Sequence, residues 1–509
     1  MERTTVWEAE NRGTGYLSWR DAAEYVLPGK ISADRAHFSL LALFSFLILF
    51  VPLGRGDLNG YDDATFAHEA KEMILTGDWW NVRFNGYLHF DKPPLFVWCE
   101  AGSMKIFGIS DFAAKFPVAL FGLGTILLVY FIARELTDRF WLPIIAMLVM
   151  TTTQYFMKYA MHAMTCVPFT FFFALAMLSY LKGLKQQRYL LLCGLATGLA
   201  DLTRSPMGWF PLVIIVVHLI VTRQRRLLWS KYLIACFLIA VLLPMLWYWS
   251  EYQSYGSKFL SEHIANITAH GASEQKRGAT QFVLGFLEYP YLLLKIYWPW
   301  LPFMVIGFAT QFRKMLRERE VQASLLVIWV LCVLLPFSLA DTKVLRYILP
   351  AFPAFAILSA SVLDKWIPSL RKPAFFKLLY SLGCIFVVYA ALFPMTRLRA
   401  TDMRKLAPVA EANTAPQERV LLYTRGVREW NYQTQFLWYG NRYSELVTDL
   451  TEIESRFRSA TNTVAIIDKE SSDRLVAALG TENRIRLLAQ SENFACIKYL
   501  ERSDLKGGT

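Results

Sequence analysis

Charged side chains are scarce in this sequence. Asp, Glu, Lys and Arg together make up 18% of its 509 residues, whereas a soluble protein carries about a quarter. Hydrophobic residues make up 55% of the chain, and the mean hydropathy is +0.32. Apolar runs long enough to cross a bilayer recur over the first 400 residues. The composition therefore argues against a soluble globular protein and indicates a polytopic membrane protein.

Cysteine motifs are also missing. None of the seven cysteines forms a Cys-x-x-Cys pair or shows metal-ligand spacing, and most lie inside apolar runs. We therefore expect free, mostly buried thiols, with no metal site and no cofactor. The segment before the first apolar run is long and mixed in charge, unlike a cleavable signal peptide. That run, Phe38–Leu53, is expected to stay as a membrane anchor.

The excess of basic residues has a topological explanation. The net charge is +12, which in a soluble protein would suggest nucleic acid as a partner. Here Lys and Arg gather in short loops between apolar runs, so no nucleic acid is expected. The positive-inside rule assigns these loops and the N-terminus to the cytoplasm. The basic residues are Lys30, Arg35, Arg134, Arg139, Lys182, Lys185, Arg188, Arg223, Arg225, Arg226, Lys231, Arg313, Lys314, Arg317, Arg319, Lys365, Arg371, Lys372 and Lys377.

The apolar runs predict about eleven membrane spans, and up to thirteen, each of a length that suits the bilayer. They cover approximately residues 37–55, 113–134, 140–158, 166–182, 188–203, 206–222, 231–250, 290–311, 321–340, 345–364 and 374–395.

These spans divide the chain into three parts. Residues 1–36 are expected to be a cytoplasmic segment, and residues 37–400 a transmembrane domain with long outer loops at 56–112 and 251–289. From residue 401 to 509 the composition is that of a soluble protein, with short apolar strands alternating with helical stretches. The expected strands and helices are Val420–Tyr423, Val464–Ile467 and Phe494–Tyr499, and Leu450–Arg458 and Ser472–Leu479. The predicted fold is an all-α polytopic membrane protein with a small C-terminal α/β domain outside the cytoplasm.

The first outer loop, residues 56–112, is expected to be ordered. Ala64–Leu75 has a helical pattern, and Pro93-Pro94 can begin a second helix because proline is tolerated in a first helical turn. Between them lie five aromatic residues, a density typical of helices and segments at the lipid interface. They are Trp79, Trp80, Phe84, Tyr87 and Phe90.

The same loop carries residues suited to group transfer. Asp62 or Asp63 can take a proton from an acceptor hydroxyl. Lys92 is a compact positive charge that can hold a lipid-linked phosphate as it leaves. Arg204, Lys343 and Arg346 lie at the outer ends of predicted spans, where ionisable residues are costly unless they function or reach the interface.

Each of these residues also has a structural interpretation. Carboxylates favour the first turn of a helix, which would explain Asp62 and Asp63, and Lys92 can be an interface anchor. The other three cations can reach the interface without binding phosphate. The residues with a weaker case for substrate contact are His162, His263 and Tyr347.

A family resemblance favours the functional interpretation. The stretch Gly60-Tyr61-Asp62-Asp63-Ala64-Thr65-Phe66-Ala67-His68-Glu69-Ala70-Lys71-Glu72-Met73 is followed by Phe90-Asp91-Lys92-Pro93-Pro94-Leu95, then by Thr203-Arg204-Ser205-Pro206-Met207-Gly208 and Lys343-Val344-Leu345-Arg346-Tyr347-Ile348-Leu349-Pro350. In order and spacing these motifs resemble the bacterial branch of the protein O-mannosyltransferase superfamily, which includes the aminoarabinose transferases that modify lipid A. The resemblance covers the whole membrane portion.

The resemblance implies a C-type glycosyltransferase (GT-C) fold and a polyprenyl phosphate sugar donor, which in a bacterium is expected to be undecaprenyl phosphate. It implies transfer with inversion to a lipid A, glycan or protein acceptor, at the outer face of the bacterial inner membrane among its lipids. It places Asp62 at the acceptor, with Asp63 as its partner where the family more often has Glu, and Lys92 at the donor phosphate.

One position departs from the family pattern. Cys166 stands before Val167-Pro168, where the family usually has an acid. This departure weakens any metal proposal and leaves open a non-catalytic binding subunit. A transporter or flippase for polyprenyl-linked sugars is a further alternative. Against it, the sequence has no internal hydropathy repeat and no charged pairs deep in the spans.

Overall fold

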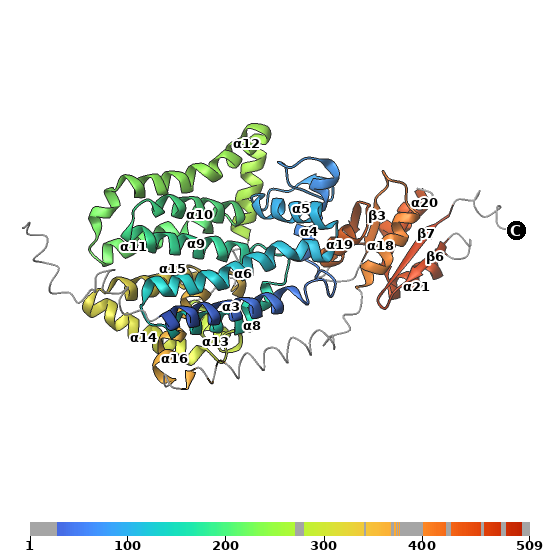
Figure 1. Ribbon diagram of the computed structural model, residues 1–509. Helices are drawn as coiled ribbons and strands as arrows, with labels where there is room; N and C mark the ends of the chain where they lie inside the picture. The colour runs from blue at the N-terminus through green and yellow to red at the C-terminus, as the bar shows by residue number, and fades with distance from the viewer. Residues whose placement is uncertain are drawn as a thin grey trace, which may run out of the picture.

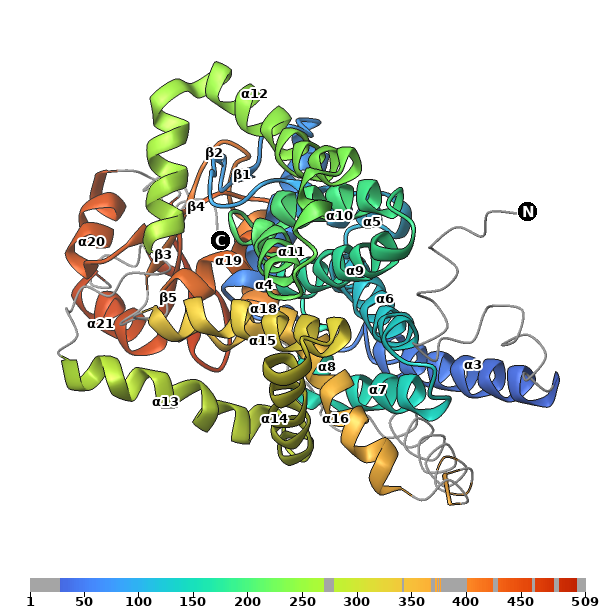
Figure 2. The ribbon, with the colours of Figure 1, turned by 90° about the vertical axis from the view of Figure 1, so that its left-hand side faces the viewer.

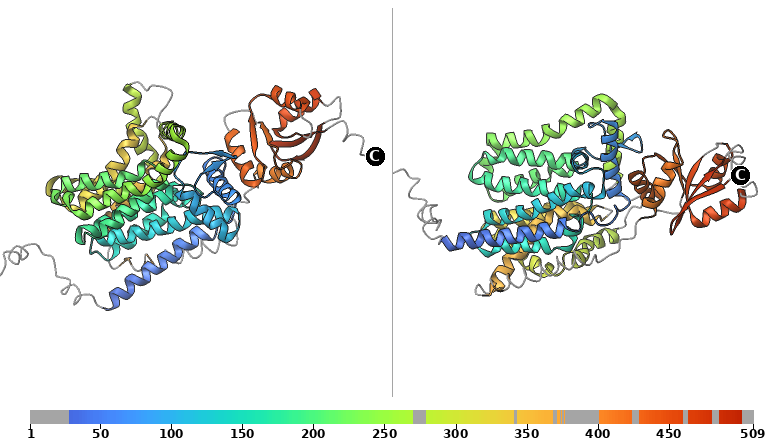
Figure 3. Two further views of the ribbon diagram at one scale, coloured as in Figure 1. Left: turned by 90° about the horizontal axis from the view of Figure 1, so that it is seen from above. Right: turned by 45° about the vertical axis from the view of Figure 1, so that its right-hand side comes forward.

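A helical bundle joined to a smaller unit with a β-sheet makes up the molecule. The computed structural model describes residues 28–269, 279–340, 343–367, 371, 372, 374, 376, 401–423, 429–459, 463–479 and 485–500. Figure 1 shows the long helices side by side and the sheet-containing unit at one end of them, with α4 and α5 at the junction. The views in Figure 3 show the same arrangement from two other directions.

The bundle is that of a multi-pass membrane protein. Within the described residues, five helical segments are long and apolar enough to cross a membrane. They are Asp111–Leu136, Cys166–Lys185, Lys231–Thr268, Val321–Leu339 and Leu345–Trp366. Four shorter apolar segments accompany them: Arg35–Phe50, Trp141–Thr152, Tyr189–Thr203 and Met207–Val221.

The helices of the bundle follow one another in chain order. They are α3 (Pro28–Phe50), α6 (Asp111–Leu136), α7 (Trp141–Thr152), α8 (Gln154–Tyr159), α9 (Cys166–Lys185), α10 (Tyr189–Thr203), η1 (Met207–Trp209), α11 (Phe210–Val221), η2 (Arg225–Trp229), α12 (Lys231–Ala269), α13 (Ala279–Ile296), α14 (Leu301–Glu318), α15 (Val321–Leu339), η3 (Leu345–Ala351) and α16 (Phe352–Trp366).

The count of about eleven long spans differs from this arrangement. The span predicted at 290–311 is wrong, because α13 ends at Ile296 and α14 begins at Leu301. Pro299 and Pro302 lie at this break, and proline cannot donate the backbone hydrogen bond that a continuous helix needs. The span predicted at 374–395 lies almost entirely outside the described residues.

Helix α12 extends well beyond the span predicted at 231–250. It runs to Ala269, with a kink at Gly256, whose φ of 58° and ψ of −135° are not helical. Glycine adopts such a backbone conformation without steric cost. Figure 2 shows α12 turning sharply, so that its second leg runs down beside the first outer loop. Much of the stretch expected as a second outer loop is therefore helical.

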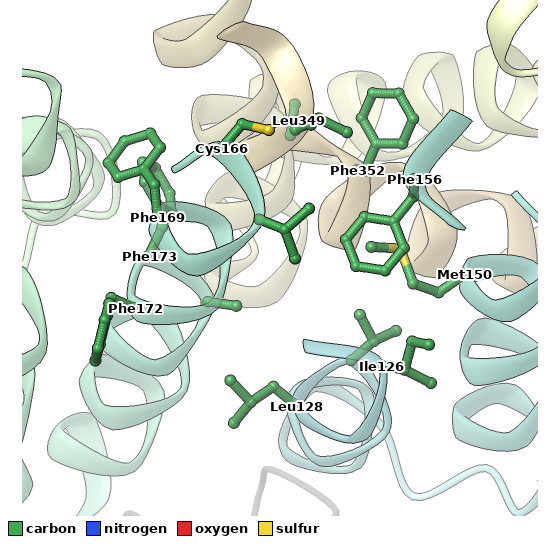
Figure 4. Packing of buried hydrophobic residues seen from close by; sticks show 14 of the residues in the cluster. Ile126, Leu128, Met150, Phe156, Cys166, Phe169, Phe172, Phe173, Leu349 and Phe352 are labelled. Atoms are coloured by element: carbon green, nitrogen blue, oxygen red, sulfur yellow. The ribbon is translucent and has the colours of Figure 1, made fainter. Parts of the chain in front are cut away.

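Buried apolar side chains fill the space between the bundle helices. Phe156, Phe173 and Phe352 are fully buried and come from α8, α9 and α16, and Figure 4 shows them with their neighbours. Close helix packing also depends on glycine: a Cβ atom on Gly194 of α10 would lie 2.5 Å from the Cys236 carbonyl oxygen of α12. The small residue allows the two backbones to approach.

The first outer loop folds into two helices and a short hairpin. Helix α4 (Asp62–Thr76) begins next to the predicted start and α5 (Leu95–Phe107) directly after Pro94. Between them, β1 (Arg83–Phe84) pairs antiparallel with β2 (Tyr87–Leu88). One aromatic residue of this segment, Phe84, is buried and stacks on Trp430 of the C-terminal unit, with ring centroids 4.8 Å apart. It therefore contacts protein where the sequence predicted the lipid interface.

The C-terminal unit, residues 401–500, contains a mixed sheet of five strands in the order β4-β3-β5-β7-β6. Strand β3 is parallel to β4 and β5, whereas β7 is antiparallel to β5 and β6. Its elements are α18 (Asp402–Ala412), β3 (Val420–Tyr423), α19 (Glu429–Tyr439), β4 (Ser444–Val447), α20 (Leu450–Ser459), β5 (Val464–Asp468), α21 (Lys469–Leu479), β6 (Ile485–Gln490) and β7 (Phe494–Tyr499). A mostly helical membrane protein with a small C-terminal α/β unit is confirmed at this level.

Candidate functional site

The first turn of α4 carries two carboxylates that face the bundle. Asp62 forms an ion pair with Arg346 of η3, with 2.9 Å between Oδ2 and Nη2. Both side chains are about a quarter exposed, 23% for Asp62 and 26% for Arg346. The N-terminus of a helix favours negative charge, so the first turn of α4 and the guanidinium of Arg346 both suit an acidic side chain at this position.

Asp63 lies in a more enclosed position. The residue is 2% exposed, and its Oδ2 atom accepts hydrogen bonds from His162 Nδ1 at 2.7 Å and Asn59 Nδ2 at 3.3 Å. His162 comes from the short turn between α8 and α9. The structure thus places this histidine on a carboxylate, where the sequence suggested a substrate contact.

A second guanidinium lies in the same region. Arg204, at the end of α10, is 7% exposed and lies 4.2 Å from the centre of the Tyr347 ring. Its Nη1 atom donates to Thr165 Oγ1 at 3.4 Å, directly before α9. Tyr347 is buried beside Phe337 and so packs against both an arginine and an aromatic ring.

Cys166 begins α9 directly after Thr165, the residue that accepts from Arg204, and its thiol is buried. Figure 4 shows the sulfur directed toward Leu349 of η3, among apolar side chains. The residue that replaces the family's usual acid is therefore next to the candidate site, although it adds no charge to it.

Lys92 lies on the same loop as the two carboxylates. Its ammonium group bonds to the Asp91 carboxylate and lies 5.4 Å from the centre of the Phe66 ring. His263 of α12 holds the backbone nearby, because its Nδ1 atom donates to the Phe90 carbonyl at 2.8 Å. The other ring nitrogen is 3.4 Å from Ser205 Oγ. Through this histidine, the segments that carry Lys92 and Arg204 are tied together.

Lys343 has local partners. Its ammonium group donates to the carbonyls of Phe337, Ser338 and Ala340, the last two at 2.5 and 2.6 Å. These carbonyls are at the C-terminal end of α15, where a positive charge is favourable. The geometry accounts for Lys343 as a helix cap, and its contact with a phosphate stays a prediction.

A group of buried acids behind Asp63 was not predicted from the sequence. Glu69 Oε1 lies 2.6 Å from His89 Nδ1. Burial raises the pKa of Glu69 even though His89 opposes the shift. Glu100 is fully buried, and neither of its carboxyl oxygens has a hydrogen-bond partner among the residues that the structure describes. Burial, then the charges of Glu69 and Asp63, raise its pKa well above the ordinary value. The sequence held one signal of this arrangement: Asp62 and Glu69 are seven residues apart, which places both on one face of a helix.

No group of three or more His, Cys, Asp or Glu side chains in the described part of the chain is arranged to hold a metal ion.

Comparisons with known proteins bear on this site. A profile of the dolichyl-phosphate-mannose-protein mannosyltransferase family matches residues 91–249, which include Lys92, His162 and Arg204. A protein of Aquifex aeolicus is 28% identical over 70% of this chain and 72% of its own length. Undecaprenyl phosphate-alpha-4-amino-4-deoxy-L-arabinose arabinosyl transferases of Serratia proteamaculans and Edwardsiella ictaluri are 27% and 29% identical over 66% and 70% of this chain. The matches span 60% and 65% of those two transferases.

Solved structures share the fold. ArnT from Cupriavidus metallidurans in the apo state matches with a TM-score of 0.69 and 17% identity, over 92% of this chain and 98% of that one. The same enzyme bound to undecaprenyl phosphate also matches with a TM-score of 0.69, over 91% of this chain and 98% of that one. The oligosaccharyltransferase AglB from Archaeoglobus fulgidus matches with a TM-score of 0.56 and 13% identity, over 88% and 70% of the two chains.

Proposed function

Because this chain belongs to the dolichyl-phosphate-mannose-protein mannosyltransferase family of GT-C membrane glycosyltransferases, we propose that it transfers a sugar from a polyprenyl phosphate to an acceptor hydroxyl. The resemblance that the sequence motifs showed is confirmed by these comparisons. The observation that carries the proposal is the ion pair of Asp62 with Arg346, with Asp63 on His162 and Arg204 on Thr165 in the residues directly before α9. Undecaprenyl phosphate is the proposed donor carrier, supported by its presence in the ArnT structure.

The proposed reaction is a single displacement. The Asp62 carboxylate takes the proton of the acceptor hydroxyl, and the acceptor oxygen forms a bond to the anomeric carbon of the sugar. The bond from that carbon to the phosphate oxygen breaks, and its electron pair leaves with the polyprenyl phosphate. Attack from the side opposite the phosphate inverts the anomeric centre.

The cations have a role in the second half of this step. Negative charge builds up on the leaving phosphate beside low-dielectric lipid, where positive charge is most effective. Lys92 is proposed to contact this phosphate, with Arg204, Arg346 or Lys343 as a second cation. Arg346 also orients the Asp62 carboxylate through their ion pair.

Asp62 is the better base on geometric grounds. Its carboxylate is partly open to solvent, whereas Asp63 is enclosed and already accepts two hydrogen bonds. Asp63 is therefore proposed to support the site. His162 and Tyr347 were expected to contact the substrate, and they are now proposed to act through Asp63 and Arg204, which they touch. His263 is proposed to position the segment that carries Lys92.

The proposed setting is the bacterial inner membrane, which the arabinosyl transferases of similar sequence support. The basic loops favour a cytoplasmic N-terminal segment over residues 1–36, a membrane domain over 37–400 and a C-terminal domain over 401–509 outside the cytoplasm. The acceptor is proposed to be a lipid such as lipid A, a glycan or a protein at that outer face.

The fate of the donor tests this proposal. The purified protein in nanodiscs is given undecaprenyl phosphate-linked aminoarabinose and lipid A, and free undecaprenyl phosphate is measured by mass spectrometry. An enzyme consumes the donor, and Asp62→Asn stops this. A flippase or a binding subunit leaves the donor intact. Mass spectrometry of lipid A, glycans and envelope proteins from a deletion strain then identifies the acceptor that loses its sugar.

A further inference from the structure

We infer that helix α19 of the C-terminal unit sets the position of the catalytic carboxylates, and that Thr434 is the positioning residue that fixes the backbone before Asp62. The inference rests on the proposed role of Asp62. It assigns to the C-terminal unit a part in the reaction, although that unit lies outside the bundle (Figure 1).

The backbone directly before Asp62 has an unusual conformation. Tyr61 has a φ of 74° and a ψ of −125°, which corresponds to the first central residue of a type II′ turn. Glycine dominates this position because a Cβ atom makes it unfavourable. About half of the Tyr61 surface is exposed, so burial of its side chain does not hold this conformation. Neighbouring contacts must therefore hold this conformation, which is typical of functional sites.

The contact at Tyr61 itself comes from the C-terminal unit. The Tyr61 N–H donates to Thr434 Oγ1 at 3.0 Å, and the Thr434 hydroxyl donates in turn to the Asn431 carbonyl at 3.0 Å. Thr434 is fully buried. Its hydroxyl is thus satisfied as both acceptor and donor, and a side chain without a hydroxyl would leave the Tyr61 N–H unpaired.

The residues before Tyr61 are fixed to the same helix. The Leu58 N–H donates to Tyr439 Oη at 2.9 Å, and the Leu58 carbonyl accepts from Gln435 Nε2 at 3.1 Å. A Cβ atom on Gly60 would lie 2.6 Å from the Asn431 carbonyl oxygen. Glycine at this position is what allows the loop to approach α19 so closely.

Helix α4 continues this contact beyond the carboxylates. Lys71 Nζ donates to the carbonyls of Trp438 at 2.9 Å and Gly440 at 2.5 Å, at the C-terminal end of α19. His68 Nδ1 donates to the Leu437 carbonyl at 3.1 Å. Because both α4 and the loop before it are attached to α19, a shift of α19 would move Asp62 relative to Arg346.

The test compares Thr434→Val with Thr434→Ser in the full-length protein. Two measurements are made: hydrogen exchange of the peptide that contains the Tyr61 amide, and donor consumption with undecaprenyl phosphate-linked aminoarabinose and lipid A. The control is Gln433→Met, which removes a 3.1 Å hydrogen bond from α19 to Ser444 inside the C-terminal unit. Thermal unfolding of each variant shows how much protein is folded.

We expect Thr434→Val to exchange the Tyr61 amide faster and to lower kcat roughly ten- to a hundredfold, since small misplacements of catalytic groups have effects of this size. The KM for the donor should change little, Thr434→Ser should restore both measurements, and Gln433→Met should resemble the parent. Unchanged exchange in Thr434→Val overturns the inference, as does faster exchange with normal kcat while Asp62→Asn is inactive. Full activity of Asp62→Asn instead overturns the proposed function, and the exchange measurement still decides whether Thr434 holds the loop.

Discussion

An ion pair of 2.9 Å between Asp62 and Arg346 joins the first outer loop to the C-terminal part of the membrane domain. The carboxylate belongs to the first turn of α4 and the guanidinium to η3, so residues distant in sequence share one site. An exposed ion pair contributes little to stability. The significance of the pair is therefore chemical, because it places a cation beside the partly exposed Asp62 carboxylate.

Replacing Asp62 by Asn should abolish sugar transfer with little loss of folded protein. An amide cannot accept the proton of the acceptor hydroxyl, and removal of a general base costs on the order of 10²–10⁴ in rate. Asp63→Asn should have a smaller effect. Donor consumption by purified variants measures both. Turnover of Asp62→Asn close to that of the parent would show that another group takes the proton.

His162 should act through Asp63. Its ring lies 2.7 Å from the Asp63 carboxylate, so His162→Ala should reduce kcat by allowing that carboxylate to move. The double variant with Asp63→Asn should then be no slower than Asp63→Asn alone, since residues that act as a unit are not additive. Additive losses in this double-mutant cycle would instead indicate that His162 contacts the substrate independently.

Local sequence patterns were sufficient for several parts of the fold. Strands β3, β5 and β7 of the C-terminal unit follow the predicted apolar runs, and α4 and α5 follow the helical pattern and the Pro-Pro pair. Strand β6 was missed because its side chains are half exposed or exposed along its whole length, which leaves a weak apolar pattern. The break at Pro299 was missed because apolar residues on both sides concealed two helices as one span.

The candidate site, like the fold, could be predicted from the sequence only in part. Asp62 and Lys92 were chosen because the first outer loop carries side chains suited to accept a proton and to hold a phosphate, and Arg346 was chosen because ionisable residues at predicted span ends need a reason. Sequence alone did not reveal which cation faces which carboxylate, since Arg346 approaches Asp62 only through the packing of η3 against α9. Glu100 was missed for a related reason. It lies in an apolar helix, and only the tertiary fold places it behind Asp63.

Lys92 should bind the polyprenyl phosphate. Lys92→Ala is expected to weaken binding of undecaprenyl phosphate in nanodiscs and to slow transfer. Lys92→Arg should restore only part of the binding, because a planar guanidinium does not replace a compact charge. The matched control is Lys105→Ala, whose ammonium lies over the Trp79 ring in the same loop. If Lys92→Ala binds as tightly as the parent, the phosphate site lies among Arg204, Lys343 and Arg346.

The orientation in the membrane is open to a labelling test. Basic loops predict that the α11–α12 connection is cytoplasmic and the C-terminal unit is outside. Single cysteines at Ser455 and Arg226, both exposed, should therefore differ in spheroplasts treated with an impermeant thiol reagent. We expect labelling at Ser455→Cys alone, in a background without the native cysteines. Labelling of Arg226→Cys alone would reverse the orientation.

Stability of the outer loop should fall as the pH rises above neutrality. Burial lowers the pKa of His89, but the hydrogen bond and charge of Glu69 outweigh it, so the pKa of His89 is raised. Such a group binds more protons in the folded state, and its contribution is complete below the ordinary histidine pKa of about 6.5 and is lost as the pH rises through the raised value. The raised pKa of buried Glu69 has the same sign. Thermal unfolding in detergent between about pH 6 and about pH 8 should therefore show a falling midpoint in the parent and a flatter profile in His89→Gln. Equal slopes in the two proteins would mean that this pair does not control the pH dependence of the loop.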